Sequence, residues 1–373
     1  MDLITLTLFI LGFIVLIAGA EFLVRGASWL AESFGVSSLV VGLTVVAFGT
    51  SAPELAVTMT AEFNGTGGIG LGNVVGSNIA NVLFILGLSA AVAPLVVDQK
   101  LVRLEIPLMI GISVLTLIYA LDGVIARIES LLFVIGLVVY IIWAVRQSLR
   151  ETAAIKAEYA QEFDIKEART PFNWVKNIVF FLGGLGGIIL GANWLVNGAV
   201  AIATLFGISE VIIGLTVIAV GTSLPELATS VVASLRGERD IAVGNIIGSN
   251  IFNLMFILGL TGTVSPDGIQ VEATALGFDL PIMIVVAVAT LPAAAIGFRI
   301  DRWEGFLFFG YYIAYIITQV LIATENTILP TYNAIMLFFV IPLTVITAGV
   351  IYFRQVRNGN NNTPEPQPAA ADD

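Results

Sequence analysis

The sequence contains no cysteine, no histidine and few charged residues. The absence of cysteine excludes disulfides, thiolate metal sites and thiol nucleophiles, and the absence of histidine excludes an imidazole base or metal ligand. Charged residues make up 12% of the chain, about half the share of roughly 25% in soluble domains. Any ion that this protein binds must therefore be held by oxygen atoms.

The chain is instead rich in long hydrophobic segments. Hydrophobic residues make up 58% of the chain, and uncharged runs such as 3–20 and 335–353 approach the roughly 20 residues that a helix needs to cross hydrocarbon. The sequence therefore predicts an all-α polytopic integral membrane protein with the lipid bilayer as its partner. The net charge of −11 argues against nucleic acid, and no feature indicates an enzyme, a cofactor or an obligate protein partner.

Eleven apolar segments are candidates for membrane spans. They lie at 3–24, 38–62, 69–94, 104–121, 126–147, 174–200, 209–235, 241–264, 276–297, 303–323 and 333–354. The polar segment 148–173 between the fifth and sixth spans is expected to be a cytoplasmic linker. The composition of 358–373 is typical of a disordered tail.

Basic residues sort to one side of this arrangement. If the linker is cytoplasmic, the span order places all but Arg127 of the 16 Lys and Arg residues on the cytoplasmic side. Cytoplasmic loops collect basic residues, and a missed span would scramble the sorting. We therefore expect the N-terminus outside and the protein in the cell (plasma or inner) membrane.

An internal repeat divides the chain. Residues 42–88 align without a gap on 214–260, and 27 of the 47 aligned positions are identical. The second copy begins five spans after the first, and because five is odd the copies must cross the membrane in opposite directions. Inverted repeats with a site near the midplane are a recurring plan of transporters. We expect two inverted five-helix repeats, 1–147 and 174–323, and an accessory eleventh transmembrane helix within 324–357.

Each copy carries the motif Gly-Thr-Ser-x-Pro-Glu, at 49–54 and 221–226. The proline interrupts the helix beside a glycine, which frees backbone carbonyls to face a cavity. Glu54 and Glu226 then lie deep in hydrocarbon, where a charged carboxylate costs roughly 2.5–3.5 kcal/mol or more. Structural burial would require a Lys or Arg partner for each, but no basic residue is predicted inside a span near them. Protonation of one or both glutamates stays open as well, and ion binding is the favoured interpretation.

A second motif, Gly-Asn-x-x-Gly-Ser-Asn-Ile-x-Asn, follows at 72–81 and 244–253. Spacings of four place Asn73, Ser77 and Asn81 on one helix face, as they do the corresponding residues of the second copy. Glycines four residues apart let another helix approach closely. Alone, the motif fits ordinary small-residue packing equally well; beside the duplicated glutamates it favours an oxygen cage.

The two motifs supply the ligands that a hard cation requires. Calcium takes about six to eight oxygen ligands, including carboxylates, carbonyls and amides. With both glutamates ionised, the empty site carries about −2, which is costly to enclose in a dehydrated state. One Ca²⁺ or two or more Na⁺ would neutralise it, so movement is favoured only when the site is loaded. This behaviour is that of an antiporter, and it does not by itself identify the ions.

The motifs in this order resemble the paired alpha-repeats of the sodium/calcium exchanger family, the prokaryotic-type calcium/sodium antiporters of the cation/calcium exchanger superfamily. The resemblance covers about 1–323. It implies a ten-helix core in which helices 2, 3, 7 and 8 surround the ions, and helices 1 and 6 slide to alternate access while Na⁺ is exchanged for Ca²⁺. By motif position it implies that the ions are bound by Glu54, Glu226, the carbonyls of Thr50 and Thr222, and Ala47, Ala219, Ser51, Ser223, Ser77, Ser249, Asn81 and Asn253.

Two departures from the family patterns bear on the ions. Some relatives, including the potassium-dependent exchangers, have Asp where this chain has Asn253, and the neutral residue points to potassium independence. The proton/calcium branch has Gly-Asn-x-x-Glu, whereas Gly76 and Gly248 stand here at the glutamate positions, which favours sodium. A proton-coupled Ca²⁺/cation antiporter stays the alternative. A channel fits the inverted half-sites less well, and a membrane-embedded hydrolase lacks a histidine, a cysteine or a Ser–Lys pair.

Other charged residues are expected to have structural roles. Glu21 and Arg25 are spaced as an i,i+4 pair near a helix end. Glu105 and Asp279 lie near predicted span ends and are expected at the membrane interface.

Overall fold

The computed structural model describes residues 3–64, 67–150, 170–207, 213, 217, 219–347 and 349. Within these residues nine helices are long and apolar enough to cross a membrane, and one bent helix pair adds a tenth. The predicted all-α polytopic membrane fold is confirmed. Residues 151–169 of the linker expected at 148–173 lie outside the described residues. So do most of residues 208–218, where the span expected at 209–235 begins, and the 358–373 tail.

The chain divides into two compact units, Met1–Ile316 and Ile317–Asp373. The second unit contains α18 (Leu329–Ile335), which continues through the π-helical turn η7 (Met336–Val340) as an apolar helix to Thr347. This helix is the predicted eleventh span.

Both repeats lie in the first unit, apart from the end of the last helix, and each consists of long helices interrupted by π-helical turns, labelled η. The elements of the first repeat are α1 (Leu3–Phe34), α2 (Ser38–Val41), η1 (Gly42–Val46), α3 (Ala47–Thr50), α4 (Ala52–Phe63), α5 (Gly67–Ala80), η2 (Asn81–Leu86), α6 (Gly87–Val92), β1 (Leu95–Val96), η3 (Leu101–Glu105), α7 (Ile106–Ala120), β2 (Val124–Ile125) and α8 (Arg127–Leu149). Those of the second are α10 (Pro171–Leu205), α12 (Ala219–Thr222), α13 (Leu224–Arg236), α14 (Arg239–Phe252), η5 (Asn253–Leu258), α15 (Gly259–Val264), β3 (Ile269–Gln270), η6 (Ala275–Asp279), α16 (Leu280–Ala295), β4 (Arg299–Ile300) and α17 (Arg302–Ala323).

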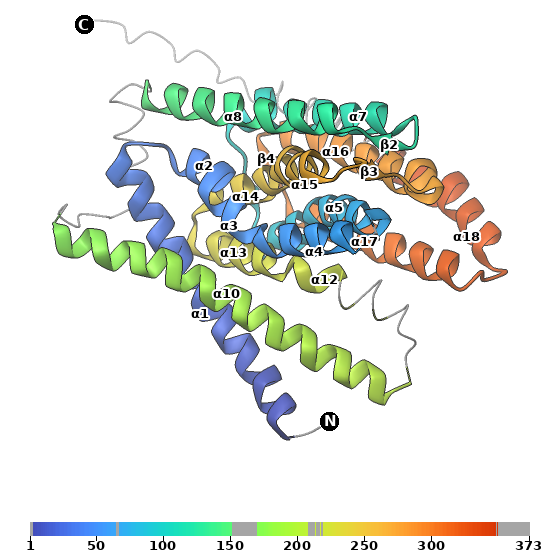
Figure 1. Ribbon diagram of the computed structural model, residues 1–373, viewed down its shortest axis with the longest axis horizontal. Coiled ribbons are helices and arrows are strands. Elements are labelled where there is room, and N and C mark those ends of the chain that lie inside the picture. The colour runs from blue at the N-terminus through green and yellow to red at the C-terminus, as the bar shows by residue number, and fades with distance from the viewer. Residues whose placement is uncertain are drawn as a thin grey trace, which may run out of the picture. The chain divides into compact units, whose positions relative to one another are not determined.

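Helices α1 and α10, the first spans of the two repeats, show the inversion directly (Figure 1). A Cβ placed on Gly12 would lie 3.0 Å from the carbonyl oxygen of Gly191, and one on Gly19 would lie 2.8 Å from that of Gly184. Residue numbers therefore rise along α1 in the direction in which they fall along α10, so the two helices are antiparallel. Gly12 and Gly19 are also the repeat equivalents of Gly184 and Gly191, at the same offset of 172. Equivalent helices thus run in opposite directions, as predicted.

The two repeats are interlaced. Strand β1 pairs with β4 and β2 pairs with β3, so each antiparallel ribbon takes one strand from each repeat. Close helix contacts follow the same pattern: a Cβ on Gly87 would lie 2.9 Å from the backbone nitrogen of Phe309, and one on Gly259 would lie 3.0 Å from the carbonyl oxygen of Ser130. Neither repeat can therefore complete its core alone.

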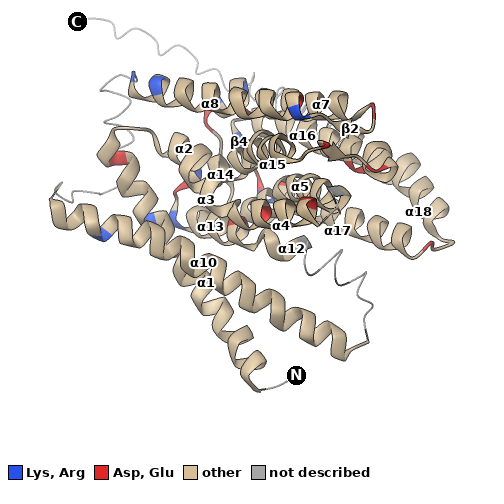
Figure 2. Ribbon diagram, in the orientation of Figure 1, with Lys and Arg blue, Asp and Glu red and all other residues tan. Residues whose placement is uncertain are grey.

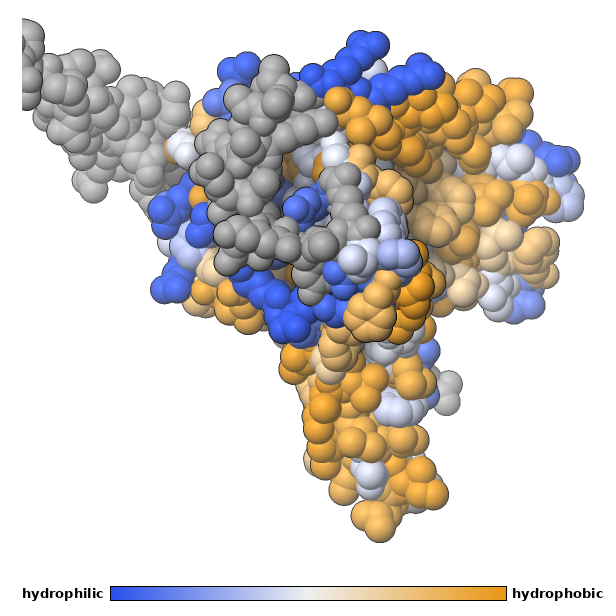
Figure 3. Space-filling view, turned by 90° about the vertical axis from the view of Figure 1, so that its left-hand side faces the viewer, coloured by the Kyte–Doolittle hydropathy of each residue, from blue (hydrophilic) through white to orange (hydrophobic). Residues whose placement is uncertain are grey.

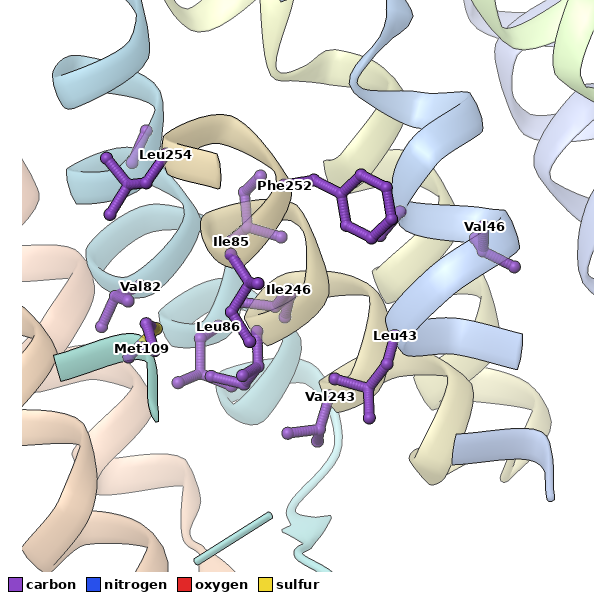
Figure 4. Packing of buried hydrophobic residues seen from close by; sticks show 14 of the residues in the cluster. Leu43, Val46, Val82, Ile85, Leu86, Met109, Val243, Ile246, Phe252 and Leu254 are labelled. Atoms are coloured by element: carbon purple, nitrogen blue, oxygen red, sulfur yellow. The ribbon is translucent and has the colours of Figure 1, made fainter. Parts of the chain in front are cut away.

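The core lies where the repeats meet. Figure 4 shows Ile85 and Leu86 of the first repeat next to Ile246 of α14, and Leu43 next to Val243. The spans carrying the second motif are the most enclosed of the described spans, since 78% of the apolar window of α5–α6 and 94% of that of α14–α15 is buried. Polar side chains on these spans face protein rather than lipid.

The outer helices present apolar side chains outward. Phe13, Ile14, Val139 and Leu182 are all at least half exposed. Polar groups without a hydrogen-bond partner are not tolerated against lipid. Because these outward side chains are apolar and lie on regular helices, the surface is suited to a bilayer. Figure 3 shows broad areas of apolar side chains, and Figure 2 shows charged residues as short coloured stretches on otherwise uncharged helices.

Helix α1 is longer than the predicted span and continues to Phe34. Glu21 and Arg25 therefore lie inside the helix rather than near its end. Arg25 donates to Glu21 across 2.8 Å, as expected for the i,i+4 pair. Glu21 also pairs with Arg236 at the end of α13, which ties the first helix of one repeat to the ion-motif helix of the other.

Glu105 lies near the start of its span, as expected, but its side chain faces protein, and its depth in the membrane stays a prediction. Its residue is 4% exposed, and it accepts a 2.6 Å hydrogen bond from the Tyr140 hydroxyl of α8. The helix begins at Leu101, before the predicted start of the span, and α8 covers the turn that carries Glu105. Asp279 is likewise held by a tyrosine, the Tyr315 hydroxyl, at 3.1 Å.

Candidate functional site

In both ion motifs the helix is interrupted at the serine that lies two residues before the proline. Ser51 separates α3 from α4 with φ −80° and ψ 7°, and Ser223 separates α12 from α13 with φ −89° and ψ 4°. The first-repeat span bends there by 45°. Because proline has no N–H, the helical ladder cannot continue through this point. The interruption was predicted from the Gly-Thr-Ser-x-Pro-Glu motif.

The interruption creates a new helix start in the middle of each span, with the glutamate in its first turn. Glu54 lies in the first turn of α4 and Glu226 in the first turn of α13. A helix N-terminus favours negative charge, since its first N–H groups are unpaired and its dipole is positive there. The fold therefore places each carboxylate where its own helix stabilises the ionised form.

Both carboxylates are fully enclosed. Glu54 is 0% exposed and Glu226 is 1% exposed. Within the described part of the chain, no Lys or Arg forms an ion pair with either of them. Ion pairing with an embedded basic residue, the alternative to ion binding, is therefore not found there.

Serine hydroxyls link the carboxylates across the two repeats. Ser51 donates to Oε1 of Glu226 across 3.2 Å, so a first-repeat hydroxyl binds the second-repeat carboxylate. Ser77 donates to Oε1 of Glu54 across 3.5 Å, and its oxygen is also 3.4 Å from that of Ser223. The motif residues of both repeats thus converge on one polar cluster.

An asparagine braces each glutamate from the neighbouring helix. Asn73 donates to the carbonyl oxygen of Glu54 across 3.4 Å and to Thr58 across 3.2 Å. Its equivalent Asn245 donates to the carbonyl oxygen of Glu226 across 3.5 Å and to Ser230 across 3.0 Å. The sequence motif contains both asparagines, but their hydroxyl partners were missed. The signal was a hydroxyl residue four positions after each glutamate.

Asn81 and Asn253 are the first residues of the π-helical turns η2 and η5, and both are 0% exposed. A π-helical turn within a span often marks a functional site. Ser249, the equivalent of Ser77, is also 0% exposed. These residues therefore lie at the buried junction of the spans, where the motif positions predicted them.

Buried oxygens without a hydrogen-bond partner gather at this cluster. Eight buried side-chain atoms of the described residues lack a partner, and five belong to predicted ligands: Glu54 Oε2, Glu226 Oε2, Asn81 Oδ1, Asn253 Oδ1 and Ser249 Oγ. Each buried polar group without a partner costs about 1–3 kcal/mol. All five are oxygens, the donor type that hard cations require. The residue types therefore fit a cation such as Ca²⁺ or Na⁺.

The remaining predicted ligands lie on the interrupted helices. Ala47 and Thr50 are 0% exposed, and Thr50 donates to Asn245 Oδ1 across 3.1 Å. The Ala47 carbonyl accepts from the backbone N–H of Ser51 across 3.0 Å, so it remains in the helical ladder here. Thr222 is half-buried, and the Ala219 side chain lies outside the described residues. A role for these carbonyls stays a prediction.

The glycine spacing of the second motif is used as predicted in the second repeat. A Cβ on Gly244 would lie 3.0 Å from the carbonyl oxygen of Leu39, and one on Gly248 would lie 2.6 Å from that of Leu43. The equivalents of these partners fall at 211 and 215, outside the described residues. For Gly72 and Gly76 the close approach therefore stays a prediction.

Known proteins match most of the chain. The family described as sodium/calcium exchanger protein matches residues 4–146 and 176–321. The putative antiporter CaxA of Alkalimonas amylolytica is 38% identical over 83% of this chain and 97% of its own. The sodium/calcium exchanger MaX1 of Methanosarcina acetivorans is 33% identical over 83% and 96%. The inner membrane protein YrbG of Escherichia coli is 37% identical over 75% and 86%.

Solved structures also match most of the chain. The sodium-calcium exchanger NCX_Mj, soaked with zero Na⁺ and Ca²⁺, superposes with a TM-score of 0.72 at 30% identity. The match covers 87% of this chain and 100% of that one. The family match takes in both inverted repeats and both motifs, so the chain belongs to the sodium/calcium exchanger family, whose members are exchanger-type antiporters.

Proposed function

We propose that this protein is a secondary antiporter that exchanges Na⁺ for Ca²⁺ by alternating access. The observation that carries the proposal is the meeting of Glu54 and Glu226 in one buried cluster without a basic partner among the described residues. Two enclosed carboxylates carry about −2, which one Ca²⁺ or two Na⁺ can neutralise. Either ion then permits a closed, loaded state that the empty site disfavours.

The proposed ligands are those implied by the motif positions. The carboxylates of Glu54 and Glu226 form the centre, since each has an oxygen without a protein partner. Around them stand the carbonyls of Thr50 and Thr222, together with Ala47, Ala219, Ser51, Ser223, Ser77, Ser249, Asn81 and Asn253. The five oxygens without partners support this set, because cation coordination satisfies them together.

Sodium is the proposed counter-ion. The cluster contains no histidine, and Gly76 and Gly248 stand where a glutamate would mark the proton/calcium pattern. MaX1 is named as a sodium/calcium exchanger, and a sodium/potassium/calcium exchanger of Gallus gallus is 33% identical over 39% of this chain. The neutral Asn253 supports exchange without potassium.

The proposed organisation follows the repeats. The repeats 1–147 and 174–323 form the exchanger core, 148–173 is a cytoplasmic linker, and 324–357 is an accessory helix. The N-terminus lies outside and the protein resides in the cell membrane. The name of YrbG as an inner membrane protein agrees with that location.

Flux in proteoliposomes tests the counter-ion. Purified protein is reconstituted with either Na⁺ or low-pH buffer inside, and uptake of ⁴⁵Ca²⁺ is followed from a Na⁺-free medium at neutral pH. An outward Na⁺ gradient is expected to drive uptake, and an outward proton gradient is not. Monensin, which collapses the Na⁺ gradient, should abolish the uptake. Uptake driven by the pH step alone would contradict sodium coupling, and equally rapid uptake into vesicles that contain neither Na⁺ nor a pH gradient would contradict antiport.

A further inference from the structure

Two asparagines outside the ligand set link the repeats through hydrogen bonds to two of the proposed ligands. Asn78 of α5 accepts at Oδ1 a 2.9 Å hydrogen bond from Nδ2 of Asn253. In the mirror arrangement, Asn250 of α14 accepts at Oδ1 a 3.3 Å bond from Nδ2 of Asn81. Asn78 and Asn250 are repeat equivalents, as are Asn81 and Asn253. Asn78 is 3% exposed and Asn250 is 1% exposed, so neither side chain can bind water from bulk solvent.

The orientation of the Asn253 amide follows from a chain of donors and acceptors. Nδ2 of Asn78 donates to the backbone carbonyl of Asn250 across 3.3 Å, and a carbonyl can only accept. This contact fixes which end of the Asn78 amide is nitrogen, so its Oδ1 faces Asn253. Only the Nδ2 end of Asn253 can donate to it. Oδ1 of Asn253 must therefore point the other way, and it is one of the oxygens without a partner.

The mirror chain has a weaker anchor. Nδ2 of Asn250 contacts the thioether sulfur of Met109 across 3.3 Å, and a thioether is a weak acceptor with no hydrogen to donate. The Asn250 amide is therefore oriented in the same sense, with Oδ1 toward Asn81. Oδ1 of Asn81 is again left without a protein partner. The Asn78 amide is thus oriented by a strong carbonyl acceptor, and the Asn250 amide by a weak sulfur acceptor.

We propose that Asn78 and Asn250 are positioning residues that lock the Asn253 and Asn81 amides with their oxygens toward the cation. The inference rests on the proposed function, because it takes the cluster of Glu54 and Glu226 as the ion site. Nδ2 of Asn253 also lies 3.2 Å from the Ser77 hydroxyl, but a hydroxyl can donate or accept, so this contact does not fix which end of the amide is nitrogen. Without the lock, each ligand amide can therefore turn by half a turn and present an NH₂ group, which repels a cation. The identity of residue 78 thereby determines whether residue 253 acts as a ligand.

A double-mutant cycle on cation binding tests the lock. Equilibrium binding of ⁴⁵Ca²⁺ and ²²Na⁺ is measured on purified protein carrying Asn78→Ala, Asn253→Ala or both. Asn78→Ala is expected to weaken binding of at least one of the ions about 3- to 10-fold, the effect of one hydrogen bond. In the Asn253→Ala background the same change should weaken binding less than about twofold, since the oxygen that it positions is gone.

The other half of the site provides matched controls. Asn250→Ala should be coupled to Asn81→Ala in the same way, whereas Asn78→Ala should keep its full effect in the Asn81→Ala background. If Asn78→Ala cannot be purified as a monodisperse protein, the Asn250–Asn81 cycle carries the test. Met109→Leu removes the sulfur acceptor and is expected to weaken binding less than Asn250→Ala.

The results separate this inference from the proposed function. An Asn78→Ala variant that binds both ions like the wild type, or one whose loss is equally large without the Asn253 amide, would overturn the positioning role. Wild-type protein that binds Ca²⁺ and Na⁺ but shows no Na⁺-driven Ca²⁺ uptake would overturn the exchange mechanism and leave the positioning test intact.

Discussion

Replacing Gly184 with alanine is expected to force α1 and α10 apart. The new Cβ would lie 2.4 Å from the backbone nitrogen of Leu23 and 2.7 Å from the carbonyl oxygen of Gly19. Ordinary contacts begin at 3.4 Å, so the helices must separate by about 1 Å (3.4 − 2.4). Both obstructing atoms are backbone, and no rotamer change can relieve the clash.

The cost can be worked from the packing. A gap of about 0.5–1 Å forfeits a quarter to a half of each dispersion contact, and overpacked substitutions typically cost about 1–3 kcal/mol. Helix association in a membrane depends on such packing, since there is no hydrophobic drive between helices. Gly184→Ala should therefore lower both the thermal stability of the purified protein and its rate of Ca²⁺ uptake.

The same helix supplies the control. Gly183 and Gly186 have no described atom within 4 Å of the position of an added Cβ. Alanine at any of the three positions gains the same helix propensity of about 1 kcal/mol, so the comparison isolates the clash. Gly183→Ala and Gly186→Ala should be at least as stable and active as the wild type. A Gly184→Ala protein that matches these two controls would refute the close crossing of α1 and α10.

Four further substitutions have defined outcomes. Glu54→Gln and Glu226→Gln should each abolish Na⁺-driven Ca²⁺ uptake while leaving the protein inserted and folded, because each removes a carboxylate that has an oxygen without a protein partner; full uptake in either would exclude that residue from the site. Asn253→Asp adds a carboxylate that cannot donate to Asn78 Oδ1 and should change the charge moved per Ca²⁺, as measured by currents on supported membranes; an unchanged charge and potassium dependence would place residue 253 outside the site. Tyr140→Phe removes the 2.6 Å hydrogen bond to buried Glu105 and should destabilise the protein by about 1–3 kcal/mol with unchanged affinity for Ca²⁺; an altered affinity would mean that Glu105 takes part in ion binding.

The sequence was sufficient to predict the inverted repeats and the burial of Glu54 and Glu226. Glu54 and Glu226 could be found because the same motif appears twice at one offset, and an odd number of spans between the copies requires inversion. The break at Ser51 was predictable because proline cannot continue a helical ladder.

Other features depended on information that apolar runs do not contain. The burial of Glu105 against Tyr140 was not predicted, since an apolar run does not show which face of a helix end packs against a neighbouring helix. The pairing of Asn78 with Asn253 joins residues 175 positions apart. Their motif indicates a polar helix face, but only three-dimensional contacts show which end of each amide faces its partner.

The most direct measurement is the stoichiometry of Ca²⁺ binding to purified wild-type protein and to the Glu54→Gln and Glu226→Gln variants. If the carboxylates share one site, the wild type binds one Ca²⁺ per chain in competition with Na⁺. Each single variant should then weaken that binding at least about 100-fold, the effect of losing about 2.7 kcal/mol from a buried charge interaction. Two Ca²⁺ ions per chain, with each variant losing one and keeping the other at wild-type affinity, would contradict the shared site.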